Sequence, residues 1–414
     1  MNHIATWSIA FLSVAGVIIR PFGTREAVWA TAGALLLIFS GLISPSEGLK
    51  GVAAGTDVYL FLAGMMLLAE TAREEKLFDW LAAYATKMAN GSATRLFILI
   101  YLVGIVVTIF LSNDATAVVL TPAVVAVTRA AKVKNPLPYV FICAFIANAA
   151  SFVLPISNPA NLVIYGKHIP PLLEWLSQYL LPSLCAIVVT YIMLYFTQRK
   201  AIGKKIEADI ILPTLPAGGR SALWGIAATI VILLTASALS VPLGLPTILT
   251  GLLTAAVVII RARKDPRIVI KGVTWSVLLL VAGLFVIVEA INKTGLTHKL
   301  FSILRNGIDK SVDATVWGSG LIVAFASNLM NNLPAGLIAG NVMEAGDVPA
   351  IIKSSILIGV DLGPNLSVTG SLATILWLVA LRREGINITA RGFLKIGILV
   401  MTVTLLFTIA SLWL

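Results

Sequence analysis

The chain has 414 residues, of which 58% are hydrophobic and only 12% are charged. Soluble domains carry about 25% charged residues, so this composition excludes a soluble enzyme of the same length. A transmembrane helix needs about 20 mostly apolar residues, and the chain has room for about ten such spans. The net charge of +11 does not indicate nucleic acid binding, because inner-membrane proteins collect Lys and Arg in their cytoplasmic loops. The sequence predicts an all-α polytopic protein of the cytoplasmic (inner) membrane, surrounded by the lipid bilayer.

Several common functional motifs are missing from the sequence. Cys143 and Cys185 lie in apolar stretches without metal-ligand spacing. No segment fits the G-x-x-x-x-G-K-[ST] pattern that cradles phosphates, so any ATP-driven step would need a separate subunit. There is also no Ser-His, H-E-x-x-H or paired-Asp arrangement suited to an intramembrane enzyme. We therefore expect no enzymatic activity, no cofactor and no resident metal site.

The first half of the chain opens with apolar spans at 4–19, 27–43 and 58–72, followed by an interfacial amphipathic helix at 77–89. Residues 96–127 carry a polar cluster at their centre and are too short for two full crossings. We predict a re-entrant hairpin there, with its tip in the middle of the membrane. A helix broken at a central proline follows at 138–168, and a further span is predicted at 172–197.

The second half repeats this order of features. It begins with a basic linker at 199–220 and three spans at 222–240, 244–260 and 274–291. An amphipathic helix follows at 296–305, then a hairpin at 315–342, a broken helix at 352–380 and a last span at 394–413. Ala63-Gly64 followed by Glu70 recurs as Ala282-Gly283 followed by Glu289, and the same offset carries Asn113 onto Asn332. We predict two repeats of five transmembrane helices, 1–198 and 221–414, each with a re-entrant hairpin and a broken helix.

Loop charge predicts the orientation of these repeats. Five crossings in the first repeat would make the second repeat inverted. With both termini outside, most of the 30 Lys and Arg residues fall in cytoplasmic segments, as the positive-inside rule requires. The loop 44–57 has one cation, whereas its repeat partner 261–271 has five. Inverted repeats are the architecture of alternating-access carriers.

Four polar clusters interrupt the apolar spans, at 111–114, 157–161, 328–334 and 361–367. Irregular backbone at that depth is tolerated only where it is buried in protein or lines a cavity, so we expect the four clusters to meet at one central pocket. Asn and Ser offer hydrogen-bond donors and acceptors without charge, which suits a small, uncharged, hydroxyl-rich solute. The alternative is that they bridge helices. The candidate binding residues are Ser112, Asn113, Asn158, Asn161, Asn331, Asn332, Asn365 and Ser367.

Two carboxylates, Asp114 and Asp361, lie deep in the pattern of spans. Carboxylates at this depth are rare and usually functional. Burial penalises the charged form, so either group can take up a proton on one side and release it on the other. Asp114 is the first candidate for proton coupling and Asp361 the second. The alternative for Asp361 is a capping or hairpin-tip bond to backbone amides. For Glu70 and Glu289, near the interface, a helix-end or ion-pair role is favoured.

At these motifs the sequence resembles the arsenite/antimonite efflux carriers of the ArsB family, in the ion transporter superfamily. The resemblance runs essentially end to end and rests on FLSNDATAVVLTP (110–122), SNPANLVIY (157–165), SNLMNNLP (327–334) and GVDLGPNLSVTGS (359–371). It implies a secondary transporter that exports trivalent arsenic and antimony, as trihydroxides, in exchange for protons. It also implies a soluble ATPase subunit in some systems and, from the superfamily, often a homodimer. The transported arsenic or antimony would be the only metal-like species bound.

The main rival is a sodium/proton antiporter or a dicarboxylate symporter on the same scaffold. An anion site should place hairpin-tip amides and a cation at the pocket, whereas this tip carries Asp114 with no basic residue nearby. A channel is a further alternative, which the resemblance disfavours.

Overall fold

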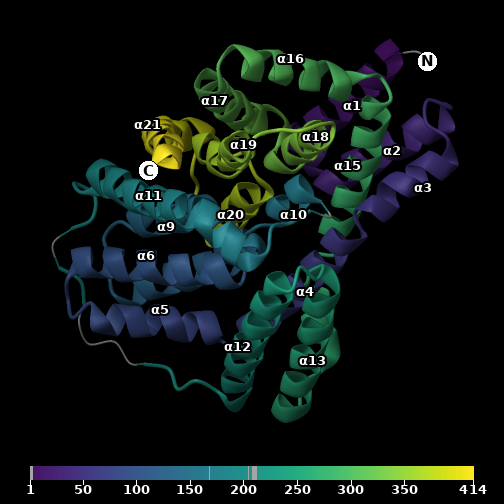
Figure 1. Ribbon diagram of the computed structural model, residues 1–414. Helices are drawn as coiled ribbons and strands as arrows, with labels where there is room; N and C mark the ends of the chain where they lie inside the picture. Colours follow the sequence, from purple (N-terminus) through teal and green to yellow (C-terminus); the bar gives the residue numbers. More distant parts are fainter. Residues whose placement is uncertain (1–2, 167, 204, 208–211) are drawn as a thin grey trace.

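The computed structural model describes residues 3–166, 168–203, 205–207 and 212–414, and the regular elements of these residues are helices (Figure 1). Residues 204 and 208–211 of the predicted linker lie outside the described residues. The first half contains α1 (His3–Ile19), η1 (Pro21–Gly23), α2 (Glu26–Phe39), α3 (Pro45–Ala54), α4 (Thr56–Glu74), α5 (Leu77–Met88), α6 (Ala93–Phe110), α7 (Asn113–Ala115), the π-helical η2 (Thr116–Leu120), α8 (Thr121–Ala130), α9 (Leu137–Ala149), η3 (Pro155–Ser157), α10 (Pro159–Tyr165) and α11 (Leu172–Gln198).

The second half has a broadly similar series of helices, without counterparts of η1, α7 and η2. It contains α12 (Ala217–Ala238), α13 (Gly244–Ala262), α14 (Pro266–Gly272), α15 (Ser276–Asn292), α16 (Leu296–Lys310), α17 (Val312–Met330), α18 (Asn332–Glu344), α19 (Ala350–Leu362), η4 (Gly363–Leu366), α20 (Leu372–Arg383), α21 (Ala390–Ala410) and η5 (Ser411–Trp413).

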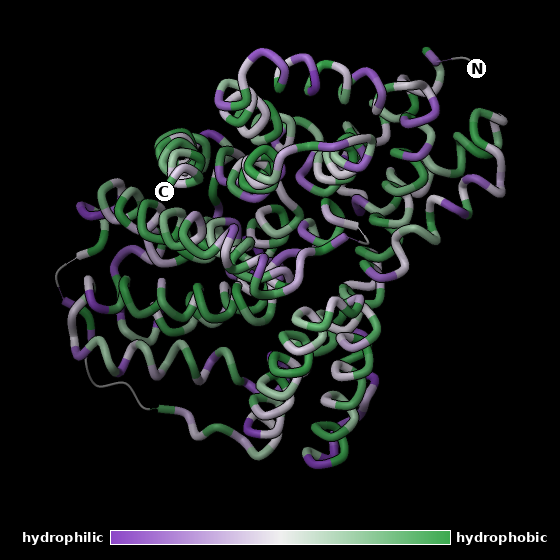
Figure 2. The backbone as a smooth tube through the Cα atoms, in the orientation of Figure 1, coloured by the Kyte–Doolittle hydropathy of each residue, from purple (hydrophilic) through white to green (hydrophobic). Residues whose placement is uncertain are grey.

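The protein is an all-helical polytopic membrane protein. Among the described residues, seven helices are long and apolar enough to cross a membrane, or eight if α3 and α4, which meet at a 49° bend, form one span. The sequence predicts ten. The difference arises because α1, α2 and α9 are apolar but have only 17, 14 and 13 residues, and because α9 and α19 stop where their spans break. Figure 2 shows hydrophobic residues along the outer helices and hydrophilic ones at turns and on α16.

Two helix pairs connect the halves of the chain in a reciprocal way. Helix α4 packs against α13, and α15 packs against α2 (Figure 1). A glycine brings each pair close together. A Cβ on Gly64 would lie 2.4 Å from the Thr247 carbonyl oxygen, and one on Gly283 would lie 2.6 Å from the Ala30 carbonyl carbon. Gly64 and Gly283 are the glycines that recur at the same offset in the sequence, so the same close contact is made twice.

We expect Gly64→Ala to destabilise the protein by about 1–3 kcal/mol, the usual cost of overpacking. The added methyl group meets backbone of α13, so the two helices must move apart to accept it. Thermal unfolding of the purified protein in detergent measures the effect. Gly318→Ala on α17 is the matched control, because a Cβ there has nothing within 4 Å. Equal melting temperatures for the two variants would contradict the close approach of α4 and α13.

Candidate functional site

The segments predicted as hairpins are each interrupted by a residue with positive φ. Ser112, between α6 and α7, has φ 141°, and Asn331, between α17 and α18, has φ 74°. Positive φ is uncommon for residues other than glycine, and such conformations cluster at functional sites. Each residue also caps the helix that follows: Ser112 Oγ accepts a hydrogen bond from the Ala115 amide, and Asn331 Oδ1 accepts one from the Leu333 amide, both at 3.3 Å. Asn113 and Asn332 therefore each become the first residue of a helix.

The two broken helices restart in a similar way. Asn158 caps α10, and its Oδ1 accepts a hydrogen bond from the Ala160 amide at 3.0 Å. Pro159 opens α10, a position where a missing N–H costs nothing. Ser371 caps α20, and its Oγ accepts a hydrogen bond from the Thr374 amide at 3.1 Å. Each half of the chain thus contributes two helix starts deep among the apolar helices.

These four helix starts meet at one small pocket. It is lined by Leu62, Asn113, Asp114, Asn158, Pro159, Val277, Asn332, Leu333, Leu372 and Ala373. A helix N-terminus carries a partial positive charge, so four of them create a region that favours negative charge or hydrogen-bond acceptors. The space has a volume of only about 10 Å³, roughly room for one water. A larger solute needs some movement of the surrounding helices to enter.

Three side chains that line the pocket have hydrogen-bonding groups without a partner among the described residues. Asp114 makes no hydrogen bond or ion pair with the described residues, and neither does the side-chain amide of Asn332. The Oδ1 atom of Asn113 is buried and has no partner. These groups are therefore available to a bound solute without breaking an existing bond.

A second, larger pocket of about 60 Å³ adjoins the first. The two share Leu62, Asp114, Pro159 and Val277, and the second also reaches Ser112, Glu70 and Gly272. Glu70 accepts two hydrogen bonds from Arg73, at 2.8 and 2.6 Å, so it takes part in the ion pair that the sequence favours. The carboxyl group of Asp114 thus lies between the central pocket and a path toward the Arg73 end of α4.

Two of the candidate asparagines hold unwound backbone instead of lining the pocket. The Asn161 amide donates to the carbonyl oxygen of Ser151 at 2.9 Å, inside the break between α9 and α10. The Asn365 amide donates to the carbonyl oxygen of Phe145 at 3.1 Å, and its Oδ1 accepts from Asn148 at 2.9 Å. The Asn161 bond thus holds the first break, whereas the Asn365 bonds connect η4 in the second half to α9 in the first.

Asn331 and Ser367 connect the second hairpin to the second broken helix. The Asn331 amide donates to the Thr369 carbonyl at 3.4 Å, and Ser367 Oγ donates to Asn328 Oδ1 at 2.7 Å. Asn328 in turn donates to the Gly363 carbonyl at 2.8 Å. The sequence did not single out Asn328 or Asn148 as site residues. Asn148 stands alone in an apolar run, and this isolated polar residue is the one sequence signal that could have drawn attention to it.

Asp361 is wholly buried in α19. Its Oδ1 accepts a hydrogen bond from the Asn158 amide at 2.7 Å, whereas its Oδ2 has no partner among the described residues. The bond is to a side chain and not to backbone amides, which were the alternative considered for this residue. Asp361 therefore contacts the pocket that contains Asp114 through the side chain of Asn158, which lines it.

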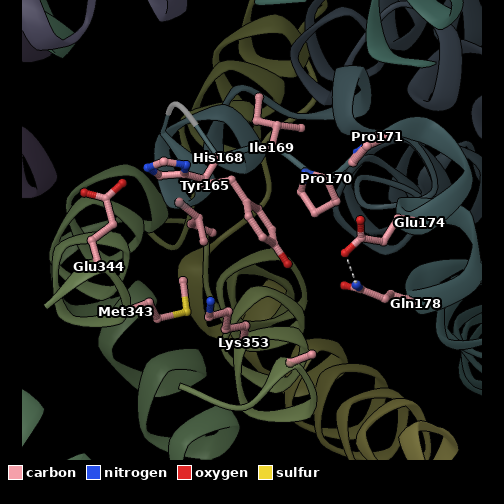
Figure 3. A pocket seen from close by; sticks show the side chains of 12 residues that line it. Tyr165, His168, Ile169, Pro170, Pro171, Glu174, Gln178, Met343, Glu344 and Lys353 are labelled. Carbon is pink, nitrogen blue, oxygen red and sulfur yellow. Dashed lines mark hydrogen bonds between the residues drawn. The ribbon is translucent and has the colours of Figure 1, made fainter. Parts of the chain in front are cut away.

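A cavity of about 680 Å³ lies on the other side of α10 (Figure 3). Its wall includes Tyr165, His168, Glu174, Glu344 and Lys353. Between this cavity and the central pocket α10 packs closely on α18, and a Cβ on Gly340 would lie 2.7 Å from the Ile164 carbonyl oxygen. Helix α10 borders both spaces, with Pro159 at the central pocket and Tyr165 at the cavity.

Hairpins and broken helices that meet at a polar pocket inside an all-helical membrane protein define a membrane transporter. The profile of the citrate transporter family (CitMHS) matches residues 14–358 of the chain. The arsenical pump membrane protein of Escherichia coli is 30% identical over 98% of this chain and 97% of its own length. The putative arsenical pump membrane protein of Bacillus subtilis is 24% identical over 97% of both chains. The chain therefore belongs to the CitMHS/ArsB family of secondary membrane transporters, which confirms the resemblance seen in its motifs.

A solved structure is similar in fold. The crystal structure of the Alcanivorax borkumensis YdaH transporter aligns with a TM-score of 0.55 and 15% sequence identity, over 91% of this chain and 88% of that one. At this level of identity the similarity concerns the fold alone.

We expect Asn365→Ala to lower stability by about 1–3 kcal/mol, because it removes two buried hydrogen bonds, one to the Phe145 carbonyl and one from the Asn148 amide. Asn332→Ala is the matched control: the same atoms are removed from a buried residue whose side-chain amide has no protein partner. Thermal unfolding in detergent compares the two. If Asn332→Ala were the more destabilised variant, the separation into structural and available asparagines would be wrong.

Proposed function

We propose that the protein exports arsenite and antimonite from the cytoplasm by proton antiport, with alternating access around the pocket where the four helices begin. The observation that carries this proposal is the pocket lining: uncharged amides from Asn113, Asn158 and Asn332 beside one carboxylate, Asp114. The arsenical pump relatives, similar over almost the whole chain, support the choice of solute.

The chemistry of the solute matches these groups. Trivalent arsenic in water is a trihydroxide, mostly uncharged near neutrality, which both donates and accepts hydrogen bonds. Amide side chains do the same without charge. Cys143 is buried in α9 and neither cysteine lines the pocket. A thiolate site would hold trivalent arsenic too tightly for rapid release, so a pocket of amides suits a carrier.

Asp114 gives a direct way to couple the solute to a proton. An ionised carboxylate accepts a strong, charge-assisted hydrogen bond from a solute hydroxyl. When the carboxylate takes up a proton, it loses this advantage and the solute is bound less tightly. Asp361 is the second coupling group, because it holds Asn158 at the pocket through the bond between them. Protons and solute then compete for one site, as antiport requires.

The orientation we propose follows from charge. The two halves, 1–198 and 221–414, would be inverted repeats of five spans with both termini outside. The path from Asp114 toward Glu70 and Gly272 would then open to the cytoplasm, where Arg73, Lys264 and Lys271 lie, and the cavity beside Tyr165 would face outward. Exchanging one proton for a neutral solute moves one charge inward, which is worth about 2.3 kcal/mol at 100 mV. That sustains a gradient of roughly forty-fold.

The rival function is transport of a dicarboxylate or of sodium, and the citrate transporter profile makes it worth testing. Among the described residues that line the central and adjoining pockets there is no Lys or Arg. A dicarboxylate would therefore meet Asp114 without a compensating cation. Counterflow with sodium or succinate in place of arsenite tests this alternative directly.

We expect everted vesicles that contain the protein to take up arsenite without ATP when a proton gradient is imposed, and to lose this uptake when an uncoupler is added. Asp114→Asn should reduce uptake to the level of vesicles without the protein, because the amide cannot exchange a proton. Asp309→Asn, on exposed α16 beside Arg305, is the control and should behave like wild type. Unchanged uptake by a folded Asp114→Asn protein would exclude Asp114 as the proton carrier. Uptake insensitive to the uncoupler would point to facilitated diffusion or to an ATPase partner.

The proposed orientation predicts which loops are reached from outside the cell. In a variant with Cys143 and Cys185 replaced by Ser, a cysteine at exposed Lys310 should react with a membrane-impermeant maleimide in intact cells. A cysteine at exposed Arg267 should react only in everted vesicles. The reverse pattern would place both termini in the cytoplasm.

A further inference from the structure

The cavity beside Tyr165 ends at a pair of tyrosines. The Tyr165 hydroxyl lies on the side of this cavity where Glu174 is found (Figure 3). It is 2.5 Å from the hydroxyl of Tyr179 on α11, and either oxygen can donate. Tyr179 is completely buried, whereas Tyr165 is on the cavity wall. The pair therefore carries hydrogen-bonding atoms from an open cavity into the closed interior.

Beyond Tyr179 the next polar groups belong to α19. Helix α19 packs against α10, and its residues Ala350 and Lys353 line the same cavity as Tyr165, so the buried side chains of Ser354 and Asp361 follow inward along α19. Ser354 and Asp361 are seven residues apart, which is about two turns, so they share one face of the helix. Aromatic rings surround this route: Phe152 and Trp175 both pack on Tyr179. Such rings keep bulk water away and leave the hydroxyl groups as the polar path.

The far end of the route reaches the pocket. Asp361 Oδ2 is buried without a partner, and Oδ1 holds the Asn158 amide. We propose that protons from the outer cavity reach Asp361 through the hydroxyl groups of Tyr165 and Tyr179, separately from the solute. This inference rests on the proposed function. It assigns to Asp361 the uptake of protons from outside, while Asp114 lies on the path toward the opposite face.

The transfer is a relay in which only O–H bonds change. Water in the cavity gives a proton to the Tyr165 oxygen as Tyr165 passes its own proton to Tyr179. Tyr179 passes its proton on, across the Ser354 hydroxyl or a bridging water, to Asp361 Oδ2. The hydroxide left in the cavity takes up a proton from the outside solution, the carboxylate is protonated, and both tyrosines end neutral. The charged and titratable groups that face the entrance are Glu174, Glu344, Lys353 and His168, with Asp361 at the other end.

The experiment compares two assays on reconstituted protein, using arsenite as the solute. Tyr179→Phe keeps the packed ring and removes the hydroxyl group. We expect proton-driven arsenite uptake to fall by about tenfold or more, equivalent to about 1.4 kcal/mol of barrier. Arsenite counterflow without a proton gradient should stay close to wild type, because solute exchange needs no net proton transfer. Tyr165→Phe on the cavity wall repeats the test if Tyr179→Phe does not fold.

Tyr101→Phe is the matched control. Tyr101 is also buried, but its hydroxyl donates to the Ile187 carbonyl at 2.6 Å, away from this route. It should leave the ratio of the two assays unchanged. The inference is overturned if Tyr179→Phe matches wild type in both assays, or loses counterflow as much as proton-driven uptake. If the wild-type protein itself moves no arsenite in either assay, the proposed function fails, which is a different result from a change in one variant.

Discussion

Breaking a helix inside a membrane frees backbone groups that no water can satisfy, and the whole site depends on how this protein meets that requirement. The carbonyl groups at the breaks accept hydrogen bonds from the amides of Asn161, Asn365 and Asn328. Because these bonds fix the unwound segments, α10 and α20 can restart in the interior and aim their N-termini at the pocket. Without them the breaks would not hold one geometry, and no pocket would persist.

The asparagines therefore divide into two groups with different tasks. One group connects separate elements through hydrogen bonds, as Asn365 does with the Phe145 carbonyl and the Asn148 side-chain amide. The other group, represented by Asn113 and Asn332, begins the hairpin helices at the pocket. Composition cannot separate these tasks, since both groups have the same side chain in the same kind of motif. Which task an asparagine has depends on whether a backbone carbonyl lies within hydrogen-bonding distance of its side-chain amide.

This division also marks how far sequence reasoning goes for this protein. Apolar runs and proline positions placed most helices, the helix interruptions at Ser112 and Asn331 and the breaks within a few residues, because these features follow from local chemistry. Partners distant along the chain could not be predicted: nothing near Asp361 indicates that it bonds Asn158, and nothing near Tyr179 indicates Tyr165. Ten spans are expected from the sequence, whereas seven or eight of the described helices are long and apolar enough to cross a membrane, because apolar content does not reveal where a helix stops short.

Four helix N-termini at one point favour an anion, which is the property expected of a scaffold whose family profile describes citrate transport. In this chain Asp114 lies at the start of one of those helices, and no Lys or Arg lines the described pocket around it. The protein thus supplies its own negative charge to the positive helix ends. The pocket that remains for a solute is therefore close to neutral and rich in hydrogen-bonding groups. In the function we propose, the carboxylate of Asp114 would in this way turn an anion site into one for a neutral hydroxide, and its protonation would decide whether that solute is held or released.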